Sequence, residues 1–234
     1  MKISVIVPCY NEEKNVINCY KRVKKILKGY NYEIILEEEG SKDRTPEIIK
    51  ALARKDRKVR VLSFPGEKRG KGWGFRKCVQ AAKGDIVVQV DTDCQFVPEE
   101  IPKLIKPILY DDYDMTLGSR FMKDSCVKKG SITTRNYIAN KIDSLLTSIA
   151  SFRWFTDVQA GFKAFRKNVI KNIKFKENSF AYEPEIVILA SKRGYKIKDV
   201  PITYERRLGG RSNIKLFKDG YMITKAILRT WIFG

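Results

Sequence analysis

The sequence predicts an α/β protein with a mostly parallel central sheet flanked by helices. In the first half of the chain, short apolar runs rich in β-branched residues alternate with helical stretches. The clearest run, 86–90, reads as a strand buried on both faces. It leads directly into Asp91-Thr92-Asp93-Cys94-Gln95. We therefore expect two carboxylates at the carboxyl edge of the sheet, where open α/β sheets bind their ligands.

The first half of the chain follows a regular β-α order. Strands are expected at 3–7, 32–36, 59–64 and 86–90, and helices at 15–27 and 45–54. Thr45-Pro46 supplies the cap and first-turn proline of the second helix. A glycine-punctuated loop, 65–74, leads into a third helix that ends near Lys83. That loop lacks the Gly-Lys-Ser/Thr ending of a P-loop, so it is interpreted as a basic loop of another kind.

The second half is less regular. Helices are expected at 98–109, 132–155 and 183–192, with strands at 114–118 and 196–204 and a loop followed by a strand at 156–165. The final stretch has apolar residues at helical spacing with lysine and arginine between them. Residues 1–212 are therefore predicted to form one domain, and residues 213–234 an appended amphipathic helix.

Composition narrows the chemistry. The chain has 234 residues, a net charge of +20 and no histidine. The lack of histidine excludes His-based zinc sites, Ser-His-Asp triads and histidine general bases. The charge predicts an anionic partner: nucleic acid, an anionic membrane or a phosphorylated substrate. The five cysteines are scattered without a C-x-x-C pair, which is typical of free thiols in a reducing compartment.

The acidic pair after the fourth strand is the strongest candidate for a metal site. Strand alternation would point Asp91 and Asp93 to the same side, with the amide of Gln95 close behind. Hard divalent cations prefer such oxygen ligands and are usually held by one or two carboxylates plus substrate phosphates. The cofactor expected here is Mg²⁺ or Mn²⁺. Taken alone, the pattern is also compatible with solvated acids in a loop.

Six motifs, in order along residues 3 to 213, resemble those of family 2 glycosyltransferases with the GT-A fold, in particular the dolichyl and polyprenyl phosphate sugar synthases. They are Val7-Pro8-Cys9-Tyr10-Asn11-Glu12, the acidic pair before Gly40-Ser41, Asp91 to Gln95, Gly118-Ser119-Arg120, Asp157 to Phe162, and Arg207 to Ser212. The resemblance implies a GT-A domain over residues 1–212. It also implies an inverting transfer of a hexose (mannose, glucose or an N-acetylhexosamine) from a GDP- or UDP-linked donor to dolichyl or polyprenyl phosphate.

The resemblance assigns roles residue by residue. Nucleotide-binding positions are Pro8, Tyr10, Glu12, Glu38, Glu39, Gly70 and Lys71. Metal-binding positions are Asp91, Asp93 and Gln95, and catalytic positions are Asp91, Asp93, Arg120 and Asp157. Positions for the acceptor phosphate are Arg120, Arg135, Arg207, Arg211 and Ser212. Glu183 lies in a stretch that faces the sugar and acceptor in the family.

The chemistry of a phosphate acceptor is consistent with this composition. A phosphate monoester has a second pKa of ~6, so it is already largely a nucleophile at neutral pH and needs no general base. A sugar hydroxyl would need one. Transfer to a sugar hydroxyl of a glycan or glycolipid is the alternative enzyme hypothesis. A nucleic-acid-binding protein is a further one, but its usual recognition motifs are missing.

One departure from the family pattern concerns the donor. Glu38-Glu39 replaces the Asp-Asp pair that usually precedes Gly-Ser. One of those aspartates normally contacts the base, and the added methylene displaces the carboxylate. A catalytically impaired scaffold of the same fold is therefore also a hypothesis.

The C-terminal stretch has the length of a membrane span, but Lys225 and Arg229 interrupt it. Each such charge costs ~2.5–3.5 kcal/mol near the centre of a membrane helix. An interfacial helix on an anionic membrane is expected instead, with ordinary packing on the domain as the alternative. The sequence thus predicts a peripheral protein at the cytoplasmic face of a membrane, without a transmembrane helix.

Overall fold

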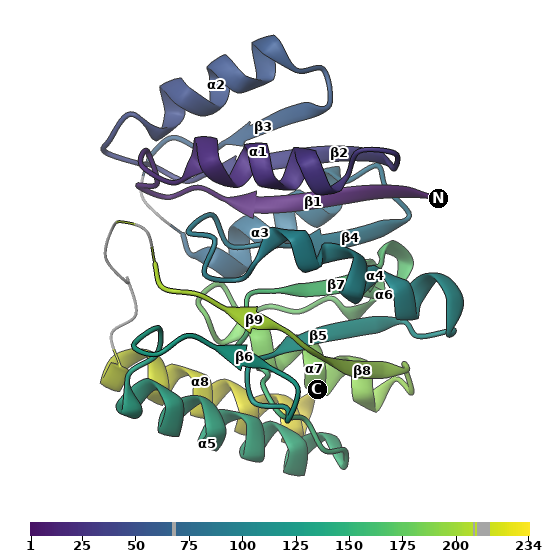
Figure 1. Ribbon diagram of the computed structural model, residues 1–234. Helices are drawn as coiled ribbons and strands as arrows, with labels where there is room; N and C mark the ends of the chain where they lie inside the picture. The colour runs from purple at the N-terminus through teal and green to yellow at the C-terminus, as the bar shows by residue number, and fades with distance from the viewer. Residues whose placement is uncertain (67–68, 208, 210–215) are drawn as a thin grey trace.

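A seven-stranded sheet forms the centre of the protein (Figure 1). The computed structural model describes residues 1–66, 69–207, 209 and 216–234. In that part the strand order is β3-β2-β1-β4-β7-β5-β8. The strands are β1 (Lys2–Pro8), β2 (Asn31–Glu38), β3 (Val59–Ser63), β4 (Ile86–Gln89), β5 (Met115–Ser119), β7 (Lys163–Arg166) and β8 (Ile197–Pro201). Only β7 runs antiparallel to its neighbours, so the predicted mostly parallel sheet is confirmed.

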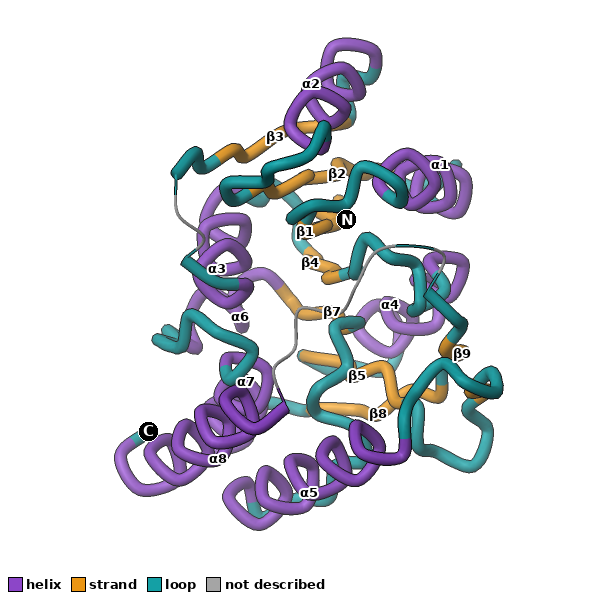
Figure 2. The backbone as a smooth tube through the Cα atoms, turned by 90° about the vertical axis from the view of Figure 1, so that its left-hand side faces the viewer, coloured by secondary structure: helices purple, strands orange, loops and turns teal. Residues whose placement is uncertain are grey.

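Helices cover both faces of the sheet (Figure 2). One face carries α1 (Val16–Ile26), α2 (Thr45–Lys55) and, after the 3-10 turn Pro98–Glu100, α4 (Ile101–Tyr110). The other carries α3 (Lys71–Ala81), α6 (Lys167–Ile173) and α7 (Tyr182–Lys192). Alternation along β1 sends Val5 and Val7 to the first face and Ile6 to the second. The two apolar clusters fix the register of the strands, because a slip of one residue would exchange the faces.

The strand order reverses beside β1. The chain builds outward from β1 to β2 and β3, and then returns to place β4 on the opposite side of β1. The carboxyl ends of β1 and β4 therefore meet at a topological switch point, the usual ligand position in such sheets. A two-stranded sheet of β6 (Cys126–Val127) and β9 (Thr203–Tyr204) lies beyond β5 and β8. The single strand predicted at 196–204 is thus divided into β8 and β9.

The helix predicted to follow the loop 65–74 and to end near Lys83 begins earlier than expected. We expected a glycine-punctuated loop as far as Gly74, but α3 starts at Lys71 and contains Gly72 and Gly74. A Cβ at Gly72 would lie 2.5 Å from the carbonyl oxygen of Glu177, and one at Gly74 2.5 Å from a carboxylate oxygen of Glu37. These glycines therefore permit close packing inside a helix and do not mark a loop.

The helices α5 (Thr134–Ser151) and α8 (Leu216–Phe233) lie side by side and pack on α7 (Figures 1 and 2). Ala150, Ile188, Ile223 and Ile227 form their shared apolar cluster. The helix predicted at 132–155 is shorter, because Phe152 adopts a left-handed conformation that ends it. Of the residues that the structure describes, no helix combines the length and apolar character needed to cross a membrane.

Candidate active site

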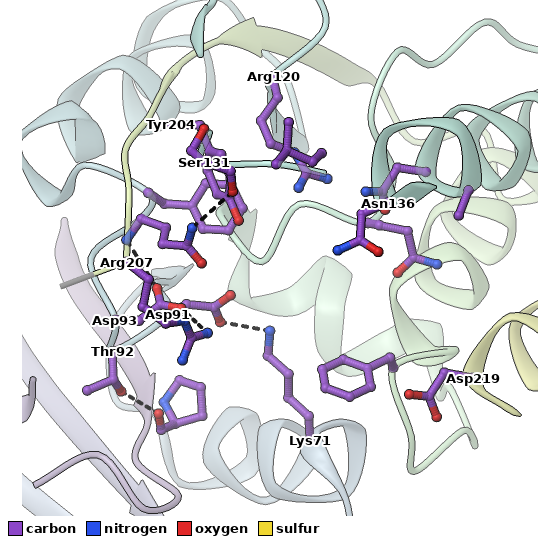
Figure 3. A pocket seen from close by; sticks show the side chains of 18 of the residues that line it. Lys71, Asp91, Thr92, Asp93, Arg120, Ser131, Asn136, Tyr204, Arg207 and Asp219 are labelled. Carbon is purple, nitrogen blue, oxygen red and sulfur yellow. Dashed lines mark hydrogen bonds and ion pairs between the residues drawn. The ribbon is translucent and has the colours of Figure 1, made fainter. Parts of the chain in front are cut away.

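A cavity of about 410 Å³ opens at the carboxyl ends of β1, β2 and β4 (Figure 3). Its walls come from the loops after these strands, from α3, from α5 and from the first turn of α8. Residues selected from the sequence line it, among them Pro8, Tyr10, Glu12, Glu39, Lys71, Asp91, Asp93 and Gln95. Arg120 and Arg207 line it as well. Segments that lie far apart in the sequence therefore meet in one concave site.

Asp91 and Asp93 reach the cavity by a different local geometry from the one predicted. β4 ends at Gln89, so strand alternation does not orient these carboxylates. They lie in a tight turn in which the Cys94 N–H donates to the carbonyl of Asp91 and the Gln95 N–H to Asp93 Oδ1, 3.1 Å away. Cys94 has a φ of 55°, in the left-handed region. The turn presents both side chains to the cavity.

Each of these carboxylates faces a cation. Lys71 Nζ lies 2.7 Å from Asp91 Oδ1, and the Arg207 guanidinium pairs with Asp93 and, at 3.6 Å, with Glu12 (Figure 3). Burial and the charge of Asp91 raise the pKa of Asp93, against the opposing charge of Arg207. Burial also raises the pKa of Glu12. This end of the cavity therefore holds closely spaced acids and bases that an anionic, metal-bound ligand could rearrange.

A buried ion pair between Lys163 and Glu183 lies next to Lys71. Lys163 is fully buried and donates to Glu183, which is also buried, and to the carbonyl oxygens of Val158 and Ala160. Lys71 Nζ lies 3.6 Å from the other oxygen of Glu183. Burial opposes ionisation of Glu183, but the charges of Lys163 and Lys71 lower its pKa. Glu183 was expected in a stretch that faces the sugar and acceptor, and in the structure it contacts Lys71 and Lys163. Lys163 was not predicted.

The donor set fits a divalent cation that arrives with a phosphorylated ligand. Within the described ranges, no three histidine, cysteine, aspartate or glutamate side chains are grouped closely enough to hold a metal. Asp91 and Asp93 offer two carboxylates. The side-chain amide nitrogen of Gln95 donates hydrogen bonds to the carbonyl oxygens of Ser131 and Glu205, which leaves its side-chain oxygen for another partner. Two carboxylates plus phosphate oxygens is a usual environment for Mg²⁺ and similar ions.

The two glutamates that replace the family's Asp pair have separate partners. Glu38 is buried and accepts hydrogen bonds from the Ser41 N–H and the Ser63 hydroxyl. Glu39 lines the cavity and accepts from the N–H groups of Arg69, at 2.7 Å, and Gly70, at 2.9 Å. Gly70 has a φ of 114° and immediately precedes α3. The longer carboxylate of Glu39 therefore holds the start of α3 in place.

Arg120 and Asp157, both predicted for catalysis or the acceptor, are paired with each other. The guanidinium donates to both oxygens of Asp157, at 2.6 and 2.8 Å, and the Arg120 N–H adds a bond of 3.0 Å. Asp157 is fully buried and Arg120 nearly so. The rings of Phe121 and Tyr204 each lie 5.1 Å from the guanidinium. Arg120 borders the cavity with its orientation fixed by Asp157.

The remaining predicted residues are Arg135, Arg211 and Ser212. Arg135 is exposed in the first turn of α5 and does not belong to the described residues that line the cavity. Arg211 and Ser212 lie outside the described residues, as does the boundary predicted at 212–213.

One wall of the cavity, formed by α5, was not predicted from the sequence. Asn136, Asn140 and Asp143 project from α5 into it, beside the loop that carries Gln159 (Figure 3 labels Asn136). Their i, i+4, i+7 spacing puts them on one helix face. Asp143 is buried, and burial raises its pKa to about 6, against a hydrogen bond from Gln159. The helical spacing of these three polar residues could have revealed this wall from the sequence.

Comparisons with known proteins agree with this geometry. The family model described as glycosyl transferase family 2 matches residues 4–174. The chain is 33% identical over 215 residues to dolichol-phosphate mannosyltransferase of Pyrococcus furiosus, covering 92% of this chain and 60% of that protein. It is 27% identical over 240 residues to glycosyltransferase AglD of Haloferax volcanii, covering 99% of this chain and 37% of that protein.

A solved structure shares the fold. Glucosyl-3-phosphoglycerate synthase from Mycobacterium tuberculosis, in complex with Mn²⁺, UDP and phosphoglyceric acid, superposes with a TM-score of 0.70 at 21% identity, covering 99% of this chain and 77% of that one. The chain spans 37% and 60% of the length of the two curated relatives described above. The match over most of the chain, the sheet order and the acidic turn after β4 lead to one conclusion: the chain belongs to glycosyl transferase family 2.

Proposed function

We propose that the protein is an inverting, metal-dependent hexosyltransferase that moves a sugar from a nucleotide sugar to a polyprenyl or dolichyl phosphate at a membrane surface. The observation that carries the proposal is the charged end of the cavity. There, Asp91 pairs with Lys71 and Asp93 with Arg207, and Arg120 lines the same cavity. A nucleoside diphosphate leaves readily only if its developing charge is neutralised, and this end of the cavity provides the groups for that task.

The roles of the chain's own residues follow from their contacts. Asp91, Asp93 and the side-chain oxygen of Gln95 would hold Mg²⁺ or Mn²⁺, which supplies Lewis-acid stabilisation of the diphosphate when bound. Lys71 and Arg207, which pair with these carboxylates in the structure, would be within reach of the phosphate oxygens of a metal-bound donor. Pro8, Tyr10 and Glu12, at the end of β1, border the side of the cavity assigned to the nucleoside. The relative with Mn²⁺ and UDP in its structure supports this arrangement by shared fold.

A phosphate acceptor is favoured by the cations around the cavity mouth. Arginine binds phosphate through a planar fork of donors, and Arg120 and Arg207 line the cavity while Arg135 lies at the start of α5. A phosphate monoester is a nucleophile at neutral pH without a base. The name of the Pyrococcus furiosus relative, a dolichol-phosphate mannosyltransferase, supports an isoprenoid acceptor.

The outer faces of α5 and α8 support a membrane location. On α5 the exposed apolar residues are Ile138, Ile142, Leu145 and Ile149, at i, i+4, i+7 and i+11. On α8 they include Leu228, Ile232 and Phe233, with exposed Lys218 and Lys225 on the same helix. Exposed apolar residues on two neighbouring helices, with lysines on one of them, suit an anionic bilayer, where each basic residue contributes ~1 kcal/mol.

Transfer to a sugar hydroxyl is the second candidate, and one observation favours it. Asp143 lines the cavity, and burial raises its pKa to about 6, the range suited to a general base at neutral pH. A hydroxyl acceptor would need such a base, whereas a phosphate acceptor would not.

A comparison of two acceptors separates the candidates. Purified protein with Mn²⁺ and a sugar nucleotide is given dolichyl phosphate, dolichol or a glycan, and transfer of labelled sugar to each acceptor is measured. We expect transfer to the phosphate alone, reduced at least about tenfold in Arg135→Ala, the loss expected for one charge-assisted contact. Lys171→Ala, on the exposed surface of α6, is the control. Transfer to a glycan hydroxyl, with no response to the lipid phosphate, would instead establish the second candidate.

A further inference from the structure

The cavity has two chemically different walls. The wall formed by Lys71, Asp91, Asp93 and Arg207 is charged. The opposite wall, formed by α5 and the loop 157–161, presents amides and one carboxylate, and Arg120, the lining cation beside that loop, is already paired with Asp157. Phosphates select cations, whereas neutral hydroxyl groups are recognised by amides, which donate and accept hydrogen bonds, and by carboxylates, which accept them. The second wall therefore matches a hydroxyl-rich ligand.

Several polar side chains on this wall line the cavity with few hydrogen-bond partners of their own. Among the described residues, none hydrogen-bonds to the side-chain amides of Asn136 and Asn140, and Gln159 Nε2 is the only group that donates to the Asp143 carboxylate, at 3.1 Å to Oδ2. No described cation pairs with Asp143, although only 7% of the residue is exposed. Buried polar groups in proteins are normally satisfied. A carboxylate with one neutral partner, at a cavity wall, is the kind of group that a ligand completes.

The loop 157–161 connects this wall to the turn that carries Asp91 and Asp93. Gly161 packs so closely on Asp91 that a Cβ there would lie 2.3 Å from Asp91 Oδ2. Gln159 is two residues away, so its Cα is at most ~7 Å from that of Gly161. Asp143 accepts its hydrogen bond from this same Gln159. The α5 wall is thus connected through Gln159 and Gly161 to Asp91, one of the carboxylates proposed to hold the metal ion of the donor diphosphate.

We infer that Asn136, Asn140 and Asp143 on α5, with Gln159, form the subsite for the hydroxyl groups of the transferred hexose, and that Asp143 accepts the hydrogen bond that distinguishes the sugar nucleotide from the bare nucleoside diphosphate. The assignment rests on the proposed function, because it takes the donor diphosphate to lie at Asp91 and Asp93. Phe180, whose ring lies 5.8 Å from Lys71 Nζ and lines the cavity, supplies an apolar surface for the ring of the sugar.

The test compares sugar nucleotides with their nucleoside diphosphates. Dissociation constants for UDP, UDP-glucose, UDP-N-acetylglucosamine, GDP and GDP-mannose are measured by calorimetry in the presence of Mn²⁺, for the wild type, Asp143→Asn and Asn140→Ala. Asp111→Asn is the matched control, since it removes the same charge from an exposed site at the opposite edge of the sheet. Thermal unfolding of each variant confirms that it is folded.

We expect Asp143→Asn to weaken the sugar nucleotide at least about tenfold while the nucleoside diphosphate binds as before, which corresponds to one hydrogen bond to a charged group. Asn140→Ala should produce a smaller loss of the same kind. If the wild type prefers the sugar nucleotide and Asp143→Asn keeps that preference, the subsite assignment is overturned. If Asp143→Asn binds the sugar nucleotide as the wild type does but no longer releases nucleoside diphosphate in a separate turnover assay, Asp143 is a general base instead. If the wild type binds none of the five nucleotides, the proposed function fails first, and this assignment with it.

Discussion

Asp143 should lower the stability of the protein at neutral pH, and its replacement by asparagine should raise it. Burial raises the pKa of this carboxyl from 3.8 to about 6, with no cation paired to it among the described residues. The folded protein therefore binds the proton more tightly than the unfolded chain, so ionisation destabilises the fold. Above pH 6 the cost is 1.36 kcal/mol for each of the roughly two units, or about 3 kcal/mol. Asparagine keeps an acceptor for Gln159 but carries no charge.

The sign of the pH dependence makes this prediction specific. Asp143→Asn should gain about 3 kcal/mol of unfolding free energy at pH 7.5 and about 1 kcal/mol at pH 4.5, where the buried carboxyl is already protonated. Guanidinium unfolding followed by tryptophan fluorescence at both pH values measures it. Asp111→Asn, at an exposed site, should change stability by less than ~0.5 kcal/mol. A variant that is neutral or less stable at pH 7.5 would refute the argument that Asp143 is buried in its charged form.

Three further predictions concern the other parts of the molecule. Arg120→Ala should lower the unfolding free energy by ~3–5 kcal/mol, because it leaves the buried Asp157 without its cation, and the double variant with Asp157→Ala should recover part of the loss in chemical unfolding. Gly72→Ala should destabilise α3 and lower the melting temperature, since its Cβ would lie 2.5 Å from the backbone carbonyl oxygen of Glu177 and 2.9 Å from Tyr182 Cβ. Ile142→Asp with Ile149→Asp should abolish co-sedimentation with anionic vesicles, whereas Asp111→Asn should co-sediment like the wild type.

The sequence predicted the fold well because its strongest signals are local. Buried runs such as 86–90 and the helical spacing between them are properties of short segments, and each became an element near its expected position. The position of the antiparallel strand β7 within the sheet could not be predicted from the sequence. Its four residues, Lys163–Arg166, carry no signal that they insert between β4 and β5, since that depends on packing across the sheet.

The candidate site divides in the same way. The acidic turn at Asp91 and Asp93 could be found because its residue types and its place after a buried strand are both visible in the sequence. The pairing of Arg120 with Asp157 could not, because the two are 37 positions apart and nothing local joins them. The buried Lys163 was missed for a related reason: lysine is almost never fully buried unless it is paired, and its partner Glu183 lies on another element.

The most direct test of the proposed activity is release of nucleoside diphosphate from a panel of UDP- and GDP-sugars, with Mg²⁺ or Mn²⁺, in the presence and absence of dolichyl phosphate. We predict release from one donor that depends on the lipid and is abolished both by EDTA and by Asp93→Ala. Release that is equal without lipid, or that survives EDTA, would contradict the proposal. Failure of every donor would contradict it as well, and would favour a scaffold whose Glu38-Glu39 pair no longer binds the nucleotide.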